Sequence, residues 1–379
     1  MTWDLFIQQN INAVSLGAIY ALFALGYAMV FSILGVLNLA HSAIFMWGAF
    51  VGLLALDVEK APILVSFLLI ATPLTALAFV FDRHVFQPLM RRIEPFSLRQ
   101  LVALLARIAY ISALVWLGNL VFQQIMTIMP ETLTIHPLIG LLLAFFAGGV
   151  LSIALEFAAF RPLRERNADR LAQLISSIGA ALILVNVAQF AFQGVYGRTE
   201  AYYPRDVSLF GLGTEPLIIG DIRVAPIRLI ILVVAVILML ILQYLVQRTQ
   251  TGQQMRAVAF NERIASLLGI DVSTIYVITF FLAGAFGGIA GMLFGISFLA
   301  VTPFVGDSIA LVGLTAIVLG GLGSIQGALI GGFIVAFIQT YSVAFGGSSY
   351  RDAIVFVLLF IMLLIRPQGL FGQAEQKRA

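Results

Sequence analysis

The stretch TIYVITFFLAGAFGGIAGMLFGISF, residues 274–298, contains no charged side chain and no proline. A helix rises about 1.5 Å per residue, so roughly 20 apolar residues are enough to cross the hydrocarbon core of a bilayer. The apolar run is continuous rather than alternating, which favours a spanning helix over a strand of a β-barrel. The stretch therefore predicts a transmembrane helix.

Further runs of this kind lie on both sides of it, separated by polar breaks. The expected spans cover residues 11–34, 39–56, 62–81, 101–122, 138–158, 172–193, 227–246, 274–298, 309–320, 325–345 and 352–365. The pair on either side of the glycine-rich turn near residue 320 can also be read as broken or re-entrant helices. We expect an all-α, polytopic transmembrane bundle with nine to eleven spans.

The composition requires contact with lipid. Of the 379 residues, 61% are hydrophobic and 10% are charged, and the mean hydropathy is +1.06. A soluble domain has about 25% charged residues, so the few charges here cannot cover a water-soluble protein of this length. The net charge of +3 is too small to predict a nucleic-acid partner.

The basic residues predict the orientation, because cytoplasmic loops are enriched in Lys and Arg. With the N-terminus outside, the inner loops and tail hold Arg83, Arg91, Arg92, Arg99, Arg161, Arg164, Arg166, Arg170, Arg248, Arg256, Arg263, Arg366, Lys377 and Arg378. The outer loops then hold only Lys60, Arg198, Arg205, Arg223, Arg228 and Arg351. The excess of inner charges predicts an N-out, C-in topology.

A short motif is repeated within the chain. Asp82, Phe86, Pro88, Leu89 and Arg92 are matched 74 residues later by Glu156, Phe160, Pro162, Leu163 and Arg166. Either two spans end alike by chance, or residues of about 62–137 are an inserted pair of spans. Two extra spans leave the orientation of all later segments unchanged. The whole chain, 1–379, is therefore expected to form a single transmembrane domain.

Missing residue types exclude several kinds of chemistry. The chain has no cysteine, and its three histidines lack the spacing of metal ligands: His41, His84 and His136. A Walker A loop needs a lysine that follows glycine, and neither Lys60 nor Lys377 does so. We expect no cofactor and no catalytic site, so any ATP that drives this protein must be bound by another chain.

Ion-coupled carriers usually keep an ionisable residue at mid-membrane. No acidic residue lies at the middle of an expected span here; Glu156 is near the inner end of its span. Arg107 lies about a third of the way into a span, where it can extend to the inner surface or meet Glu156. A secondary carrier is therefore disfavoured, although coupling through backbone carbonyls would leave no such signature.

Two polar islands interrupt the apolar runs and are candidates for a substrate pathway. In VLNLAHSAIF, residues 36–45, Asn38 can belong to a substrate pathway, or its side chain can cap the helix that follows. The two roles can coexist. In GGLGSIQGALIGG, residues 320–332, paired glycines before a serine can break a helix and expose backbone polar groups. The candidate pathway residues are Asn38, His41, Ser42, Gly320, Gly321, Gly323, Ser324 and Gln326.

The glycines of the first stretch repeat at small-xxx-small spacings. Such spacings remove side-chain bulk from one face of a helix and let a neighbouring helix approach closely. We expect a helix-packing role for Gly284, Gly287, Gly288, Gly291 and Gly295.

A long polar loop, residues 247–273, follows the span at 227–246. It contains RTQTGQQMRAVAFNERIASLLGI, with helix formers from Gln253 to Leu268. An apolar stripe is formed by Ala257, Ala265, Leu268 and Gly269. Such a helix either lies on the membrane or docks into a partner, and the residues alone leave both alternatives open.

Five blocks of this sequence together resemble the permease subunits of ABC importers for branched-chain amino acids. The blocks are GAIYALFALGYAMVFSILGVLNLAHSAIFMWGAF (17–50), FRPLRERNADRLAQLISSIGAALIL (160–184), MRAVAFNERIASLLGIDV (255–272), GGLGSIQGALIGG (320–332) and RPQGLFG (366–372). They occur in the order of that family, and the resemblance covers nearly the whole chain except about 62–137.

The resemblance implies a transport subunit in a bacterial inner membrane, without enzymatic activity of its own. Its expected partners are a second, homologous permease in a heterodimer, two cytoplasmic ATP-binding subunits and a periplasmic solute-binding protein. It implies that the polar loop contacts the ATPase, with Glu262, Ala265 and Gly269 at signature positions and Arg256 in the same block.

The resemblance also implies the solute. The first block is closer to relatives that carry leucine, isoleucine, valine or other neutral amino acids than to those that carry urea. The neutral pathway candidates would solvate either solute. The alternatives are therefore a permease of a urea or short-amide importer, or a secondary carrier or facilitator that acts without an ATPase.

Overall fold

The computed structural model describes residues 3–66, 120, 121, 123–125, 127, 128, 130, 133, 135–166, 168–205, 207, 217–219 and 222–372. The chain divides into two compact units. One is formed by Met1–Leu56 together with His136–Ala379 and is termed the bundle; the other is Asp57–Ile135.

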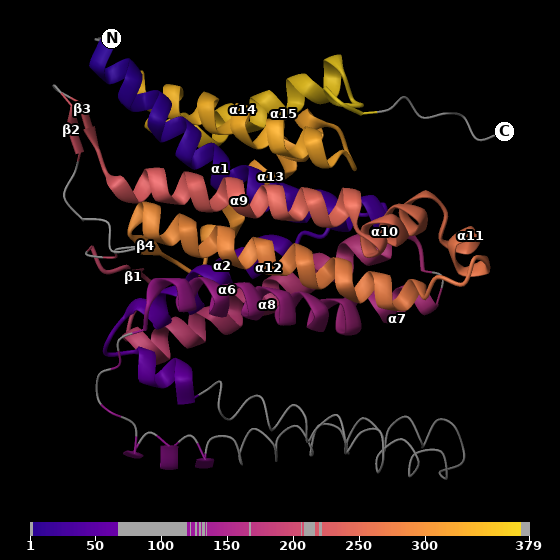
Figure 1. Cartoon of the computed structure of the whole chain (residues 1–379), viewed down its shortest axis with the longest axis horizontal. Helices are drawn as coiled ribbons and strands as arrows, with labels where there is room; N and C mark the ends of the chain where they lie inside the picture. Colours follow the sequence, from indigo (N-terminus) through magenta and orange to yellow (C-terminus); the bar gives the residue numbers. More distant parts are fainter. Residues whose placement is uncertain are drawn as a thin grey trace. The chain divides into compact units, whose positions relative to one another are not determined.

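The bundle is built from helices (Figure 1). They are α1 (Trp3–Leu34), α2 (His41–Leu56), α6 (Pro137–Leu155), the π-helical η2 (Glu156–Phe160), α7 (Arg161–Glu165), α8 (Arg170–Tyr196), α9 (Pro226–Arg248), α10 (Gln250–Phe260), α11 (Glu262–Leu267), α12 (Val272–Phe298), α13 (Val305–Gly320), α14 (Ile325–Ala344), the 3₁₀ turn η3 (Ser348–Tyr350) and α15 (Arg351–Ile365). Seven helical segments of the described chain are long and apolar enough to span a membrane, and α2 and α13 are shorter apolar helices.

The structure confirms the predicted all-α polytopic fold. Each span expected within the bundle coincides with an apolar helix, although α1 begins well before residue 11. The expected spans 62–81 and 101–122 lie largely outside the described residues, as do the earlier copy of the repeated motif and Arg107. The total number of spans and the orientation stay predictions.

The helices α1 and α12 form the centre of the bundle. α12 packs against α1, α2 and α6, and α1 also packs against α9 and α14. By contrast, α8 and α15 are mostly exposed and carry outward-facing apolar side chains such as Phe190 and Phe360. In a protein surrounded by lipid, such exposed apolar side chains need no further cover.

The α12 glycines lie where other elements approach its backbone. An added Cβ on Gly288 would overlap the carbonyl oxygen of Ala144 in α6, and one on Gly291 would overlap the carbonyl oxygen of Phe45 in α2. The remaining three likewise face a neighbour at van der Waals distance or closer: Gly284 faces Gly148 and Ser152, Gly287 faces His41, and Gly295 faces Tyr203. The small residues thus bring three helices together at one level of the bundle.

The helix α2 begins inside the bundle rather than at its end. The chain leaves α1 at Gly35, whose φ of +63° suits glycine, and α2 starts at His41. The His41 ring lies against Gly26 and Gly287, which are interior positions of α1 and α12. The short α13 also starts there, because Gly306 abuts the Ser42 carbonyl.

Two small antiparallel sheets lie at the end of the bundle where α1 starts (Figure 1). Strand β1 (Ala201–Tyr202) pairs with β4 (Ala300–Val301), and β2 (Leu217–Ile219) pairs with β3 (Ile222–Val224). Tyr203, just after β1, donates a hydrogen bond from its hydroxyl to the Ala49 carbonyl at 2.6 Å. This hydrogen bond joins the β1 segment to the middle of α2.

The second unit is described only in part. Its first residues form a turn in which the Asp57 carboxylate accepts a hydrogen bond from the Glu59 N–H at 3.1 Å. The Val58 carbonyl accepts a hydrogen bond from the Leu133 N–H at 2.8 Å, which joins the two ends of the unit.

Candidate functional site

The first polar island is buried within the bundle, where α2 begins. Asn38 and His41 are fully buried and Ser42 is 7% exposed. The Asn38 Oδ1 accepts a hydrogen bond from the Ala40 N–H at 3.1 Å, and the Ser42 hydroxyl donates to the Leu39 carbonyl at 3.1 Å. Both side chains therefore shape the turn that opens α2, while the Asn38 Nδ2 has no hydrogen-bond partner among the described residues.

Aromatic rings hold His41 in place. Its ring stacks on Phe23, with ring centroids 4.8 Å apart, and on Tyr27 at 5.7 Å. Gly26 and Gly287 leave room for it. The Phe23 carbonyl is a polar neighbour of the ring, but within the described chain neither ring nitrogen makes a hydrogen bond of acceptable geometry.

Unfilled hydrogen-bonding capacity is thus concentrated around this ring. The Asn38 Nδ2, both His41 nitrogens and the Tyr27 hydroxyl are all buried, and none of them makes a hydrogen bond of acceptable geometry with a described residue. Buried polar atoms in folded proteins are nearly always paired, and exceptions call for water, an ion or a ligand. The island can therefore receive a polar guest with neutral donors and acceptors. Tyr27 was not among the predicted residues, because a tyrosine in an apolar run is typical of packing.

The second polar island lies where α13 ends and α14 begins. Gly321 and Gly323 adopt φ of +112° and +82°, a region that favours glycine. Ser324 caps α14, since its hydroxyl accepts a hydrogen bond from the Gly327 N–H at 3.0 Å. Gln326, in the first turn of α14, is exposed. The glycines therefore do break the helix, and the serine starts the next one.

The C-terminal motif RPQGLFG packs onto this break. The Leu370 N–H donates to the Leu319 carbonyl and the Phe371 N–H to the Gly320 carbonyl, both at 2.9 Å. Gly369 comes so close to Gly321 that an added Cβ would overlap its backbone. Two blocks separated in the sequence are therefore one structural feature, and the carbonyls freed at Leu319 and Gly320 are bonded by the chain itself.

The structure does not bring the two islands together. Gly306 abuts Ser42 at one end of α13, and Gly320 lies at its other end. At about 1.5 Å per residue, the two ends are roughly 20 Å apart along the helix. A solute passing through the bundle would meet these groups in succession, at different depths.

The loop that the resemblance assigns to ATPase contact forms α10 and α11, at the end of the bundle opposite the small sheets (Figure 1). Each helix starts at a side-chain cap: Thr249 accepts a hydrogen bond from the Gly252 N–H, and Asn261 from the Ile264 N–H, both at 3.1 Å. Arg256 donates a hydrogen bond to the Val246 carbonyl at the end of α9. These contacts hold the loop against the bundle.

The exposed apolar surface of this loop differs from the predicted stripe. Ala265 is 1% exposed and faces the chain itself, whereas Leu267 and Leu268 are 82% and 75% exposed. Gly269 has a φ of +83° with open space around it and ends the α11 turn. The outward apolar side chains therefore come from the tip of the loop, and Ala265 and Gly269 shape its backbone.

A chain of polar contacts runs from this loop into a spanning helix. Glu262 accepts a hydrogen bond from the Tyr276 hydroxyl at 3.3 Å. The Arg164 guanidinium carbon lies 3.7 Å from the centre of the Tyr276 ring, and Arg164 forms an ion pair with the fully buried Glu156 at 2.6 Å. Glu156 opens the π-helical turn η2, and such turns often mark functional sites.

The sequence offered Arg107 as a possible partner of Glu156, and Arg107 lies outside the described residues, so that contact stays a prediction. Among the described residues the Glu156 carboxylate is paired with Arg164, which the sequence analysis did not propose. Glu156 and Arg164 are eight residues apart, about two helical turns, and this spacing was the signal in the sequence that could have predicted their ion pair. Tyr276 could not be found in this way, because it belongs to a helix more than a hundred residues later.

Comparisons with known proteins identify the family. Residues 10–88 and 97–363 match the family model described as branched-chain amino acid transport system, permease component; this match runs through much of 62–137, where the quoted blocks showed no resemblance. The high-affinity branched-chain amino acid transport system permease protein LivH of Salmonella typhimurium is 29% identical over 98% of this chain and 97% of its own length.

Two further relatives are also named as branched-chain amino acid transport permeases. The corresponding permease protein BraD of Pseudomonas aeruginosa is 26% identical over 98% of each chain. A probable branched-chain amino acid transport permease protein LivH of Methanocaldococcus jannaschii is 31% identical over 63% of this chain and 75% of its own length. No solved structure matches. The chain belongs to the family of permease components of branched-chain amino acid transport systems.

Proposed function

We propose that this chain is the permease subunit of an ATP-driven importer that moves branched-chain, or other neutral, amino acids across the bacterial inner membrane. The observation that carries the proposal is the similarity to LivH and BraD over nearly the whole of each chain. These relatives favour the proposal over its alternatives, a urea or short-amide importer and a carrier without an ATPase.

The chain works with partners in this proposal. It carries no phosphate-binding lysine loop, so ATP is hydrolysed on two separate cytoplasmic subunits. Leu267 and Leu268, at the tip of the α10–α11 loop, present the apolar contact for one of them. A second, homologous permease completes the channel, and a periplasmic binding protein delivers the solute.

The orientation in this proposal is N-out and C-in. The α10–α11 loop, α7 and the C-terminal segment then face the cytoplasm, where the ATPases are. The small sheets and the start of α1 face the periplasm, where the binding protein docks. The basic residues support this arrangement, because most of those that the structure describes lie in or next to the helix ends at the α10–α11 end of the bundle.

The solute pathway in this proposal includes Asn38, His41 and Ser42 and, closer to the cytoplasm, the break formed by Gly320, Gly321, Gly323, Ser324 and Gln326. These groups are neutral, so they can solvate an amino acid without trapping its charges. The unfilled polar atoms around His41 support a passing polar guest. Closure of the ATPases would then move the loop and, through Tyr276 and Arg164, the helix that carries Glu156.

We also propose that residues 62–137 are an inserted pair of spans that leaves the rest of the permease domain intact. The compact unit Asp57–Ile135 nearly coincides with this segment and supports the proposal.

Uptake by the assembled complex tests the function. Proteoliposomes with the permease pair, the ATPases and the binding protein should accumulate labelled leucine only when ATP is supplied on the ATPase side. A complex whose ATPase binds but does not hydrolyse ATP is the matched control and should be inactive. Uptake without ATP would establish a carrier instead, and urea uptake that excess leucine does not reduce would establish the amide alternative.

A further inference from the structure

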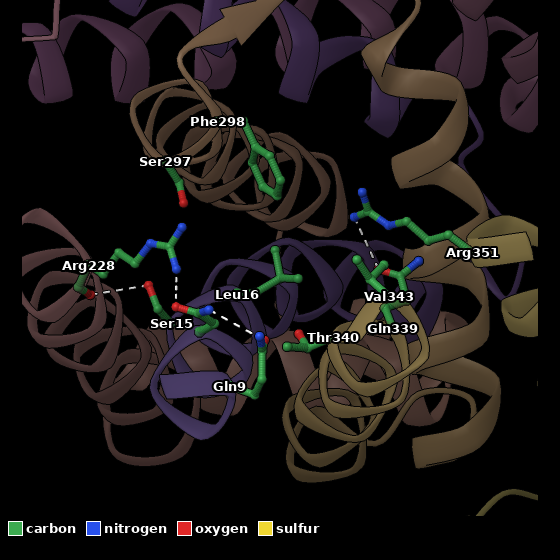
Figure 2. A pocket seen from close by; sticks show the side chains of 11 residues that line it. Gln9, Ser15, Leu16, Arg228, Ser297, Phe298, Gln339, Thr340, Val343 and Arg351 are labelled. Atoms are coloured by element: carbon green, nitrogen blue, oxygen red, sulfur yellow. Dashed lines mark hydrogen bonds between the residues drawn. The ribbon is translucent and has the colours of Figure 1, made fainter. Parts of the chain in front are cut away.

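The bundle contains a half-open cavity of about 240 Å³ at the end where α1 starts (Figure 2). Its walls come from the first turns of α1, α9 and α15 and from the last turns of α12 and α14. Two arginines, Arg228 and Arg351, extend into it from opposite sides, with Leu16 and Phe298 between them (Figure 2). None of the lining residues is acidic.

Arg228 has only neutral partners among the described residues. Its guanidinium donates a hydrogen bond to the side-chain oxygen of Asn12, and its own backbone carbonyl accepts one from the Ser15 hydroxyl at 3.1 Å. The residue lies in the first turn of α9, which begins at Pro226. A cation at a helix N-terminus meets the positive end of the helix dipole, so its position is electrostatically unfavourable unless an anion is present.

Arg351 repeats this arrangement from the other side. Its guanidinium donates to the Tyr20 hydroxyl at 2.7 Å and to the Gln339 side-chain oxygen at 3.2 Å. It is the first residue of α15, so it too lies at a helix N-terminus. No salt bridge joins Arg228 or Arg351 to an acidic residue of the described chain.

Two partly buried cations and two helix N-termini therefore meet in one cavity, and no carboxylate of the described residues lines it or forms an ion pair with either arginine; Asp352, in the first turn of α15, lines only the adjoining cavity described below. Guanidinium groups hold carboxylates by paired, charge-assisted hydrogen bonds, and helix N-termini also favour anions. We propose that this cavity binds the carboxylate of the transported amino acid between Arg228 and Arg351, before the solute enters the pathway. The proposal rests on the function proposed above and adds a determinant of solute class, because urea has no charge for the arginines to recognise.

The rest of the solute also fits the surroundings. Leu16, Phe298 and Val343 offer an apolar wall for an aliphatic side chain. A second cavity, of about 220 Å³, shares Gln339 and Arg351 with the first. It is lined by Asp352, a carboxylate that can face the ammonium group of a zwitterion.

The second cavity leads toward the buried island at His41. It reaches Val305 and Ile309 in the first turns of α13. Those turns pack on the start of α2, since an added Cβ on Gly306 would lie 2.7 Å from the Ser42 carbonyl. The cavity lined by Arg228 and Arg351, termed the arginine cavity, therefore precedes the predicted pathway residues along the proposed route of the solute.

Charge-selective labelling of a single cysteine tests the proposal. The chain has no native cysteine, and Ser297 lines the cavity. Ser297→Cys in the assembled importer, in nanodiscs of zwitterionic lipid, is reacted with methanethiosulfonates that carry either a sulfonate or a trimethylammonium group. We expect the sulfonate reagent to be favoured about tenfold relative to a free thiol, because a positive cavity concentrates anions.

Arginine variants assign the preference to the cavity. Arg228→Gln or Arg351→Gln in the Ser297→Cys background should remove most of the preference, and Arg→Lys at either position should keep it. Arg205→Gln is the matched control, because Arg205 is an exposed arginine that does not line the cavity; it should change nothing. Millimolar leucine should slow the sulfonate reaction, and equal urea or leucinamide should not.

The outcomes separate this proposal from the function itself. If the complex takes up leucine but the labelling shows no charge preference, or urea protects as well as leucine, the carboxylate site is wrong and the importer stands. If anionic phosphatidylglycerol in the nanodisc protects the cysteine and leucine does not, the occupant is a lipid and the proposal fails. Absence of leucine uptake by the unmodified complex would contradict the proposed function instead.

Discussion

Arginines at the two ends of the bundle differ in the partners that they contact. At the α10–α11 end, Arg164 is 2.6 Å from the buried carboxylate of Glu156 and lies over the ring of Tyr276. At the other end, Arg228 and Arg351 line a cavity and contact only neutral groups among the described residues. Arg164 thus has its counter-ion within the chain, whereas the two cavity arginines have no counter-ion among the described residues.

The difference separates structural from functional charge. A buried ion pair costs desolvation, and removing one partner strands the other, so such pairs hold elements in a fixed relation. Replacing a cavity arginine whose described partners are neutral leaves no buried counter-ion behind, so it should cost less stability than breaking the buried ion pair. We therefore expect Arg164 to transmit motion between the loop and the spanning helix, and Arg228 and Arg351 to receive solute.

Removal of the buried carboxylate should have the largest effect on stability. Glu156→Ala leaves Arg164 without its counter-ion, which should destabilise the bundle by about 3–5 kcal/mol. Thermal unfolding of the purified protein in detergent measures this. Arg228→Gln is the matched comparison at the other end and should shift the unfolding temperature far less. Equal shifts for both variants would remove the distinction between the two ends.

Charge at the tip of the loop should have the next largest effect, on coupling rather than folding. Leu267→Asp and Leu268→Asp place a carboxylate where an apolar contact with the ATPase is proposed, and an unpaired buried charge is costly. Because both side chains are exposed in this chain, its own stability should be unchanged. Substrate-stimulated ATP hydrolysis should fall at least tenfold.

The same test at Ala265 would be harder to interpret. Ala265 is buried against the chain itself, so Ala265→Asp would disturb the loop as well as any docking. Arg263→Lys is a suitable control, because it changes an exposed residue of the same loop and keeps its positive charge. Normal ATPase stimulation in both leucine variants would favour a loop that lies on the membrane.

Much of this architecture could be predicted from the sequence. Long apolar runs predicted the spanning helices because lipid admits few other structures. The glycines near residue 320 predicted a helix break, because adjacent glycines followed by a serine can interrupt a helix inside a membrane protein. These are local signals, in which each residue is interpreted with its near neighbours.

What could not be predicted depends on contacts between distant segments. The bonds from Leu370 and Phe371 to the end of α13 join motifs about fifty residues apart, and neither motif indicates the other. Arg228 and Arg351 read as ordinary outer-loop charges, because only the fold shows that they face one cavity. Likewise, the burial of Ala265 depends on how α11 folds back on the bundle.

The smallest expected effect concerns the cap that joins the loop to α12. The Thr274 hydroxyl and the backbone N–H groups of Ser273 and Thr274 donate hydrogen bonds to Asp271, which lowers the pKa of this carboxyl below its usual value of 3.8. A lowered folded pKa adds stability above the unfolded pKa, and this stability is lost as pH falls through the folded pKa.

The neutral-pH stability should therefore include a small contribution from the ionised Asp271. Asp271→Asn keeps a capping oxygen but cannot titrate, so its unfolding temperature should fall less than that of the parent chain between pH 7 and about pH 3. Asp271→Ala removes the cap as well and should lower stability at both pH values. If the unfolding temperatures of the parent chain and of Asp271→Asn depend on pH in the same way, the ionised Asp271 carboxylate does not contribute to the stability of the fold.

The comparison between the two ends depends on their facing opposite sides of the membrane, and labelling of single cysteines measures this directly. Arg205 follows β1, and Arg263 lies in α11; both side chains are exposed, and each is replaced by cysteine in turn. In intact spheroplasts, a membrane-impermeant maleimide should label the cysteine at 205 at once and the one at 263 only after the membrane is opened. Immediate labelling at 263 with protection at 205 would contradict the orientation and the roles assigned to both ends.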